Sequence, residues 1–585
     1  MDPESHQTSR MSSVYDDKDV EKGDESRPDS IAEDSQQPGP YQQHATTQPA
    51  FTGPANEAHQ EPPPTCDEFD GPDDPENPLN WPLWKKWYHT FIPASIALVC
   101  TLGSSIYTPG REDVMREFGV SREVSLLPYV LYVLGLACGP MLAAPTSEQL
   151  GRRAVYLVAI PIFALFILGS GFSQSIAALT ICRFFAGVFG SPGLSIGSAT
   201  LSDVWRPNER AVPMAIYVTT PFLGPAIGPL VGGYAVWAYG WRWTEWVLLF
   251  FTVAGLTPAL GMNETYKSAI LKKRAKERGL PPKQSGRTPL QAAAFFARST
   301  LTRPIHMTLV EPVVGLFTAY VAINFAMLYA FFAAFPYVFE QIYGFGIRST
   351  GLTFLGLGAG CIVGCALIIT FSKLVFKRQI QKSMAAGYGG KVNPEARLYP
   401  AMIGSICLPI SLFWFGWSAQ SSTHWMAPVV AEAVFGCGNL LIFMSATLYL
   451  MDFYGPMYGA SAMGSNNLAR YVLGTAFPLF VVQMYERLGI GWATSLLAFI
   501  SLACTPIPWC FYVWGPKLRG MTSLKSSPHN KEGFMAFGSG GILSEHNLWD
   551  CLKGEEDTSS GFRNIQGWTI ERLTPTVCPV RYPFY

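Results

Sequence analysis

The stretch Gly224-Pro225-Ala226-Ile227-Gly228-Pro229-Leu230-Val231-Gly232-Gly233 lies inside a long apolar run from about Pro213 to Trp237. That run is long enough to cross the hydrocarbon core of a bilayer. In water such a helix would be unstable, because each interior proline removes a backbone hydrogen bond and each glycine adds backbone entropy. In a membrane, neighbouring helices can satisfy the freed groups, and glycines four residues apart let another backbone approach closely. The stretch therefore predicts a bent, closely packed transmembrane helix.

The composition of the whole chain agrees with a membrane protein. The chain has 585 residues, of which 49% are hydrophobic and only 14% are charged, against about 25% charged in an ordinary soluble domain. Its formal net charge is zero, so no basic field indicates nucleic acid as a partner. The 12 cysteines form no CxxC pair and no Cys/His cluster at metal spacing, so we expect no metal and no other cofactor.

Twelve apolar runs follow one another along the chain, and each is long enough to span a bilayer. They lie at about 89–109, 124–145, 154–173, 177–201, 213–237, 243–262, 313–335, 350–372, 399–418, 425–450, 462–484 and 490–514. An even number of spans puts both termini on one side. Lysine and arginine are concentrated in the connections on that side, which the positive-inside rule assigns to the cytosol. The prediction is an all-α integral membrane protein with six helices in residues 87–262 and six in 313–514.

Three polar segments frame these halves. Residues 1–86 are rich in Ser, Asp, Glu, Gln and Pro, and we expect a disordered cytosolic tail because they cannot bury enough surface to offset ordering entropy. Residues 263–312 form a cytosolic central loop, whose basic core at 269–278 is either a helix on the membrane surface or a solvated linker. Residues 515–585 form a cytosolic tail without any recognisable motif.

A charged motif joins the second and third predicted helices, in the sequence Pro145-Thr146-Ser147-Glu148-Gln149-Leu150-Gly151-Arg152-Arg153. Guanidinium groups bind carboxylates and helix C-terminal carbonyls in fixed geometry. The motif therefore predicts a clasp at the cytosolic face that acts as a gate, made of Glu148, Gly151, Arg152 and Arg153. The alternative is ordinary positive-inside charge.

Charged residues inside the predicted helices are candidates for proton coupling, because a buried charge is costly unless it is paired or hydrated. Arg183 lies in the fourth helix, Glu432 in the tenth and Arg470 in the eleventh. Glu432 is the best intramembrane candidate for a proton carrier, since burial favours the neutral form of a carboxyl group. Asp113, at the outer end of the first helix, is a further candidate. A structural ion pair is the alternative for Arg183.

These motifs resemble those of the major facilitator superfamily. GxxxGPxxGG at Gly224 to Gly233 is similar to the fifth-helix antiporter motif of its proton-driven exporters, here Gly224, Gly228, Pro229, Gly232 and Gly233. Arg183 and Gly187 match the helix 4 motif, with Ala186 in place of its usual glutamine. Residues 144–153 resemble the helix 2–3 motif, although Ala144 replaces a glycine and Gln149 an arginine. The resemblance covers about residues 74–519 and is closest to fungal drug:proton antiporters.

That resemblance implies two pseudo-symmetric halves that rock about a midplane site, and a monomer in the plasma membrane that exchanges protons for a hydrophobic drug, toxin or secondary metabolite. A polyamine exporter of the same fold is the alternative, although a polyamine would require several carboxylates in the pocket. A membrane receptor or enzyme is a second alternative, but the helices contain no nucleophile–base pair, phosphate loop or histidine ligand set.

A pocket for a hydrophobic substrate is expected to be aromatic, with a few polar groups. Candidates for substrate binding are Tyr129, Tyr132, Tyr320, Asn324, Tyr329 and Asn439.

A second glycine ladder, Gly356, Gly360 and Gly364, repeats the four-residue spacing of Gly224, Gly228 and Gly232. Each ladder stays near one face of its helix. We expect the two ladders to pack against each other, joining helix 5 to helix 8. The alternative is that each ladder packs within its own half.

Overall fold

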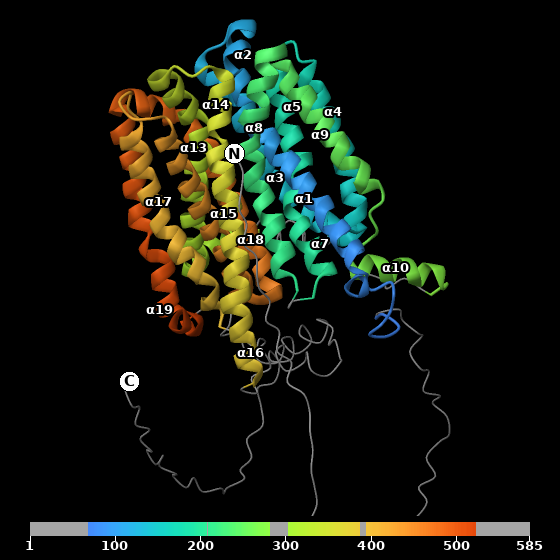
Figure 1. The fold of residues 1–585 in the computed structure, drawn as a ribbon. Coiled ribbons are helices and arrows are strands. Elements are labelled where there is room, and N and C mark those ends of the chain that lie inside the picture. Colours follow the sequence, from blue (N-terminus) through green and yellow to red (C-terminus); the bar gives the residue numbers. More distant parts are fainter. Residues whose placement is uncertain (1–67, 207–208, 281–301, 386–392, 522–585) are drawn as a thin grey trace, which may run out of the picture. The chain divides into compact units, whose positions relative to one another are not determined.

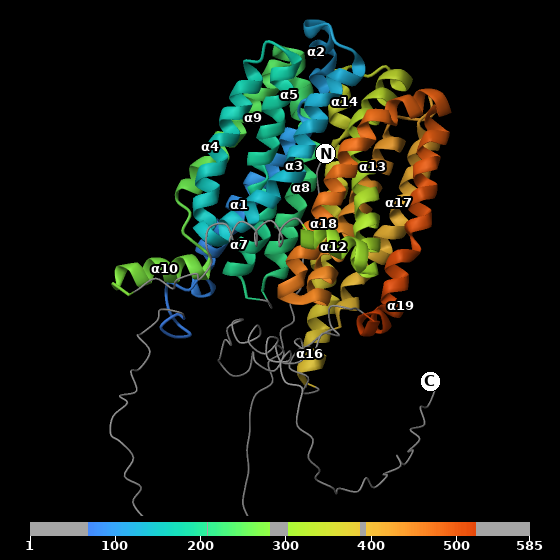
Figure 2. The ribbon, with the colours of Figure 1, turned by 180° about the vertical axis from the view of Figure 1, so that it is seen from behind.

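The computed structural model describes residues 68–206, 209–280, 302–385 and 393–521. Across these residues the regular structure is entirely helical. Residues 1–67 of the predicted N-terminal tail, residues 522–585 of the predicted C-terminal tail and parts of the central loop lie outside the described residues. The cool-coloured helices of the first half and the warm-coloured helices of the second lie beside each other in both views (Figures 1 and 2).

Six membrane-spanning segments make up the first half. They are α1 (Leu83–Ser105), α3 (Arg122–Leu150), α4 (Arg152–Gly171), the interrupted helix α5 (Ile176–Gly190), α6 (Pro192–Ser195) and α7 (Gly197–Val204), α8 (Ala211–Tyr239) and α9 (Arg242–Leu260). Short helices flank them: α2 (Arg111–Phe118) at one end of the bundle, and α10 (Lys267–Glu277) at the other (Figures 1 and 2). We call these the α2 end and the α10 end.

The second half begins with α12 (Arg303–Val310) and contains another set of long helices. These are α13 (Pro312–Tyr343), α14 (Ile347–Thr353) with α15 (Leu355–Phe371) and α16 (Lys377–Ala385), α17 (Tyr399–Ser418), α18 (Met426–Cys504) and α19 (Pro506–Met521). The predicted spans are all present. Several helices extend past the apolar runs, because polar and aromatic residues at their ends are also helical.

The 79-residue α18 is three antiparallel segments. Gly455 and Gly489 have φ angles of 68° and 75°, in the region that favours glycine. Tyr485 and Thr494 share a hydrogen bond of 2.8 Å across Gly489, although a straight helix would separate them by about 13 Å along its axis. Eleven described helical stretches are long and apolar enough to cross a membrane, and the last, Ser461–Leu518, contains this reversal. Twelve spans result, as predicted.

The prolines of α8 are tolerated because another helix supplies the missing donor. Pro229 has no N–H to donate to the carbonyl of Pro225, four residues earlier. The Ser105 hydroxyl of α1 donates to that carbonyl instead, at 2.9 Å. This is the satisfaction by a neighbouring helix that the sequence predicts for the Gly224 to Gly233 stretch.

The glycine ladder of α8 packs on α1. A Cβ added to Gly224 would lie 2.6 Å from the carbonyl oxygen of Leu98, and one added to Gly228 would lie 2.9 Å from the backbone nitrogen of Ile106. Gly232 also faces Ile106. This ladder therefore joins two helices of the first half.

The expectation that Gly356, Gly360 and Gly364 pack against α8 is wrong, because added Cβ atoms at these positions would meet the backbone of α18. The Cβ would lie 2.5 Å from Val429 O at Gly356 and 3.2 Å from Cys437 O at Gly364, and at Gly360 it would overlap Ala433 O. Each ladder packs within its own half, because four-residue spacing fixes which face is smooth but not which helix covers it. The contact between α8 and the α14–α15 helices uses other glycines: Gly233 lies against Ile347, and Gly351 against Pro229.

Residues 68–82 are ordered, so the predicted boundary of a disordered tail at residue 86 is wrong. Arg274 of α10, only 7% exposed, donates to both carboxylate oxygens of Asp74 at 2.7 and 3.0 Å and to Glu76 at 2.8 Å. Hydrogen bonds from Arg274 hold the pKa of Asp74 well below its usual range. The basic core of the central loop is therefore a helix, and its buried face binds the acidic segment that precedes α1.

Candidate substrate and proton sites

Arg183 and Glu245 form a salt bridge sealed inside the first half, with both side chains 1% exposed. Arg183, on α5, bonds the carboxylate of Glu245 on α9, and its Nη1 donates to the carbonyl of Gly103 on α1 at 2.9 Å. The guanidinium lies over the rings of Tyr107 and Tyr132, 4.8 and 5.6 Å from their centroids. Removing one partner of such a pair leaves an uncompensated buried charge. Protonation of Glu245 would have the same electrostatic consequence.

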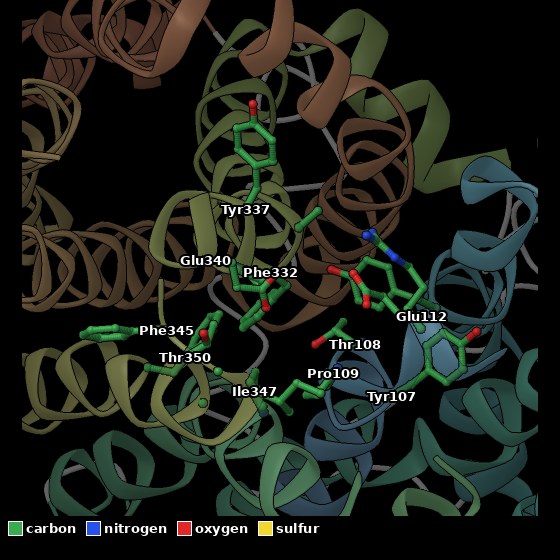
Figure 3. A pocket seen from close by; sticks show the side chains of 18 of the residues that line it. Tyr107, Thr108, Pro109, Glu112, Phe332, Tyr337, Glu340, Phe345, Ile347 and Thr350 are labelled. Carbon is green, nitrogen blue, oxygen red and sulfur yellow. The ribbon is translucent and has the colours of Figure 1, made fainter. Parts of the chain in front are cut away.

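A cavity of about 380 Å³ opens at the α2 end, and Tyr107 is part of its lining. Figure 3 shows Tyr107, Thr108 and Glu112 on one side, with Glu340 and Tyr337 of α13 across from them. Tyr107 therefore belongs both to the lining of this cavity and to the cluster around the guanidinium of Arg183.

Arg152 is the centre of the clasp predicted at the α10 end, but its carboxylate partners differ from the prediction. Its Nε donates to Asp203 of α7 at 3.3 Å, and its backbone N–H donates to Glu264 at 2.8 Å. Glu264 also accepts from the backbone N–H of Arg153 at 3.1 Å. Glu148 is exposed and forms no ion pair within the described part of the chain, so its assignment as the acidic partner is wrong.

Gly151 fits this clasp because of its conformation and its lack of a side chain. Its φ is 94°, and an added Cβ would overlap the carboxylate of Glu264. The carboxylate sits at the N-terminus of α4, where unpaired backbone N–H groups attract negative charge. It binds the loop after α9 to the start of α4.

Glu432, on α18, is 1% exposed, and neither of its carboxylate oxygens has a hydrogen-bond partner among the described residues. One turn later, Phe435 stacks edge-on against Phe331 of α13, with 4.8 Å between ring centroids. Gly436 faces the carbonyl of Leu357 on α15. Glu432 therefore lies where α13, α15 and α18 meet, as a carboxyl group without a protein partner.

Asp113 lies apart from both of these groups. It is on α2 at the end of the bundle, 3.6 Å from the exposed guanidinium of Arg116. The structure brings Glu245, not Asp113, to Arg183.

The candidate substrate residues divide among three places. Tyr129 of α3 and Tyr329 of α13 stack across the two halves, with centroids 6.2 Å apart, and the Tyr129 hydroxyl donates to the Tyr329 carbonyl at 3.0 Å. The Tyr329 hydroxyl lies 3.3 Å from that of Ser104 on α1. Tyr132 belongs instead to the Arg183 cluster, since its hydroxyl donates to the carbonyl of Cys100.

The remaining candidates lie inside the second half. Tyr320 and Asn324 are each 1% exposed on α13. Asn439 of α18 is 3% exposed, and its amide donates to the backbone carbonyl of Asn324 at 3.0 Å. The two asparagines thus tie α13 to α18.

Sequence reasoning missed three carboxylates: Glu245, Asp203 and Glu264. A signal existed for Glu245, which lies three residues into a predicted membrane run at 243–262 and is therefore an intramembrane charge by the criterion that selected Arg183. Asp203 and Glu264 lie at the ends of membrane runs, where charged residues are ordinary. Only folding shows that they meet Arg152.

The chain is similar to a known protein family and to several of its members. The family model described as Major Facilitator Superfamily matches residues 94–478. Polyamine transporter 4 of Saccharomyces cerevisiae is 38% identical over 495 residues, covering 80% of this chain and 74% of that protein. Efflux pump FUBT of Fusarium oxysporum is 38% identical over 458 residues, covering 77% and 76%. MFS-type transporter traF of Penicillium crustosum is 37% identical over 455 residues, covering 77% and 92%.

Among solved structures, the proton:xylose symporter XylE bound to 6-bromo-6-deoxy-D-glucose matches with a TM-score of 0.55. It covers 74% of this chain and 97% of its own, at 14% identity, which supports the fold alone. The sequence relatives are transporters and not enzymes. This multi-pass membrane chain therefore belongs to the Major Facilitator Superfamily.

Proposed function

We propose that this protein exports hydrophobic small molecules across the plasma membrane in exchange for protons, by alternating access between its two halves. Both termini and the α10 end lie in the cytosol in this proposal, because the basic connections gather there. The α2 end, with its cavity, then faces outward. The protein works as a monomer.

The observation that carries the proposal is the Arg183–Glu245 pair beneath Tyr107. A proton that enters from the outer cavity and binds Glu245 removes the negative charge of the pair. Arg183 is then an uncompensated charge in a dry site, which is unfavourable by several kcal/mol. A conformation that hydrates the guanidinium or restores the carboxylate becomes favoured. Proton loading thereby biases the equilibrium between two states, as coupling requires.

Glu432 provides a second protonatable group in the other half. It has no hydrogen-bond partner in this conformation, so a proton is the simplest means of neutralising it. We retain Glu432 as a proton carrier and propose Glu245 in place of Asp113 as the carrier beside Arg183. Replacing Glu245 and Glu432 one at a time decides which of the two carboxyl groups controls turnover.

The aromatic contacts between the halves support a hydrophobic substrate. Tyr129, Tyr329, Phe325 and Phe222 come from both halves and contact one another in the centre of the bundle. Aromatic walls with few polar groups suit a largely apolar molecule. Two of the relatives named above are called an efflux pump and an MFS-type transporter.

Polyamine export is the second candidate, and one observation favours it: the relative named Polyamine transporter 4 is 38% identical. A polyamine carries several ammonium groups, so its pocket should contain carboxylates. Glu432 is the one carboxylate that the sequence places within the apolar runs of the second half.

The test is proton-driven transport in proteoliposomes with a pH gradient. Glu245→Gln should abolish gradient-driven transport of a hydrophobic dye while preserving dye exchange without a gradient, because Gln mimics the protonated acid. Glu117→Gln is the matched control, since Glu117 pairs with the partly exposed Arg242 at the α2 end. Gradient-driven transport by the Glu245→Gln protein at the wild-type rate would contradict the coupling mechanism.

A further inference from the structure

Arg470 is a buried cation in the second half that the coupling mechanism does not use. It is 5% exposed, and its Nε has no hydrogen-bond partner in the part of the chain that the structure describes. Its one described hydrogen bond is a long one, 3.4 Å, from Nη2 to the hydroxyl of Tyr471. The guanidinium lies instead against three rings, with 4.9 Å to the centroid of Phe325, 4.5 Å to Phe443 and 4.7 Å to Tyr471.

No carboxylate balances this charge within the described part of the chain. Glu432 precedes Phe443 in the first segment of α18, and Phe443 contacts Arg470. Glu432 and Phe443 are about 16 Å apart along the axis of that segment, so Glu432 is not the partner of Arg470. Rings stabilise a desolvated cation less than an anionic partner does. Arg470 is therefore held by aromatic faces, and its hydrogen-bonding capacity is largely unused.

Asn466 lies one turn before Arg470, on the same face of its helix. It is 0% exposed, and neither its amide oxygen nor its amide nitrogen has a hydrogen-bond partner within residues 68–206, 209–280, 302–385 and 393–521. Two adjacent polar side chains that are both buried and both unsatisfied are unusual in a native protein, and a ligand is one explanation of such groups.

Arg470 and Asn466 lie at the junction between the two halves. Phe222 of α8, in the first half, contacts Phe443 with 5.2 Å between centroids and Phe325 with 6.4 Å. Two of the three rings that cover Arg470 are therefore the rings that meet the opposite half. When the halves separate, this contact opens and Arg470 is the cation behind it.

We propose that Arg470 and Asn466 bind the carboxylate of a weakly acidic aromatic substrate. The guanidinium pairs with the carboxylate, the Asn466 amide donates to it, and Phe222, Phe325 and Phe443 hold the apolar body. This inference rests on the proposed export function and names its substrate class. A polyamine does not fit, because the fixed positive charge repels its ammonium groups.

Three probes with one ring system test the inference: 2-naphthoate, 2-naphthalenemethanol and 2-naphthylmethylammonium, each tritium-labelled. Binding is measured on the purified full chain in nanodiscs, and proton-driven efflux is measured in proteoliposomes. The wild-type protein should bind the naphthoate more tightly than the alcohol, and the ammonium least. Arg470→Gln should weaken naphthoate binding about tenfold or more and change alcohol binding less than about threefold. Arg470→Lys should restore part of the naphthoate affinity, because lysine keeps the charge without the planar fork.

Asn466→Asp is the second variant, in case Arg470→Gln does not fold. It places a carboxylate one turn from Arg470, which should occupy the guanidinium and abolish naphthoate binding while the alcohol still binds. Arg348→Gln is the control, since Arg348 is an exposed arginine that packs over Trp237 at 3.9 Å.

Equal binding of acid and alcohol by the wild type, or equal losses for all three probes in both variants, would overturn the inference. Proton-driven efflux of the alcohol without the acid would overturn it and leave the proposed export function standing. If none of the three probes is exported under a proton gradient, both proposals fail together.

Discussion

Replacing Gly228 with alanine should force α8 away from α1. The added Cβ would lie 2.9 Å from the backbone nitrogen of Ile106 and 3.1 Å from the carbonyl oxygen of Leu102. Ordinary contact begins at 3.4 Å, so the backbone of α1 must move by about 0.5 Å. The Cβ would also overlap the Ser105 hydroxyl, which has to rotate away from it.

The expected cost combines two effects. Overpacking in a close contact costs about 1–3 kcal/mol. Rotation of Ser105 also breaks its 2.9 Å hydrogen bond to the Pro225 carbonyl, and an unsatisfied buried carbonyl costs about 1–3 kcal/mol. Because the second effect acts through the Ser105 hydroxyl, which Ser105→Ala already removes, Ser105→Ala and Gly228→Ala should be less than additive. Their coupling should be in the range of about 0.5–3 kcal/mol that is typical of contacting residues.

The assay is thermal unfolding in detergent, followed with a dye that reacts with newly exposed thiols such as that of Cys100, which is buried in the native protein. Gly255→Ala is the matched control, because Gly255 lies in α9 with nothing within 4 Å of an added Cβ, and alanine there should be neutral or stabilising. Equal unfolding midpoints for Gly228→Ala and Gly255→Ala, or strict additivity with Ser105→Ala, would refute the α1–α8 packing argument.

Three further predictions follow from described contacts. Gly360→Ala should be more damaging than Gly255→Ala in the same unfolding assay, because its Cβ would meet the backbone of α18, which cannot rotate away. Glu264→Gln should lower the unfolding midpoint by weakening charge-assisted hydrogen bonds, worth about 1.5–3 kcal/mol each, and should slow efflux, whereas Glu148→Gln should change neither. Because the pKa of Asp74 is lowered by Arg274, the stability from their contact is complete above the ordinary aspartate pKa of 3.8. It is lost only as pH falls through the lower folded value. Hydrogen exchange of residues 68–82 should thus show equal protection at pH 7 and pH 5, and Asp74→Asn should remove that protection at both.

The twelve spans and their order could be predicted from sequence, because a membrane span depends on local properties. A run of apolar residues of sufficient length must form a helix in lipid, where every backbone group needs a partner within its own segment. The Gly224 to Gly233 stretch was likewise readable as a closely packed membrane helix, since small residues four positions apart leave one helix face smooth. The docked segment before α1 was missed, because its acidic residues are stabilised by a helix that is about 200 positions away along the chain.

Only the tertiary structure decides which residues that are distant in sequence contact each other. Arg183 was recognisable as a buried charge, but Glu245 becomes its partner only where α5 and α9 pack together, 62 residues apart. The Gly360 ladder showed a smooth helix face, and only the folded bundle shows that α18 covers it. Arg470 was an unusual charge in the sequence, and the rings around it come from three separate helical segments. A sequence fixes the face that each helix presents locally, whereas the neighbour of that face depends on the packing free energy of the whole bundle.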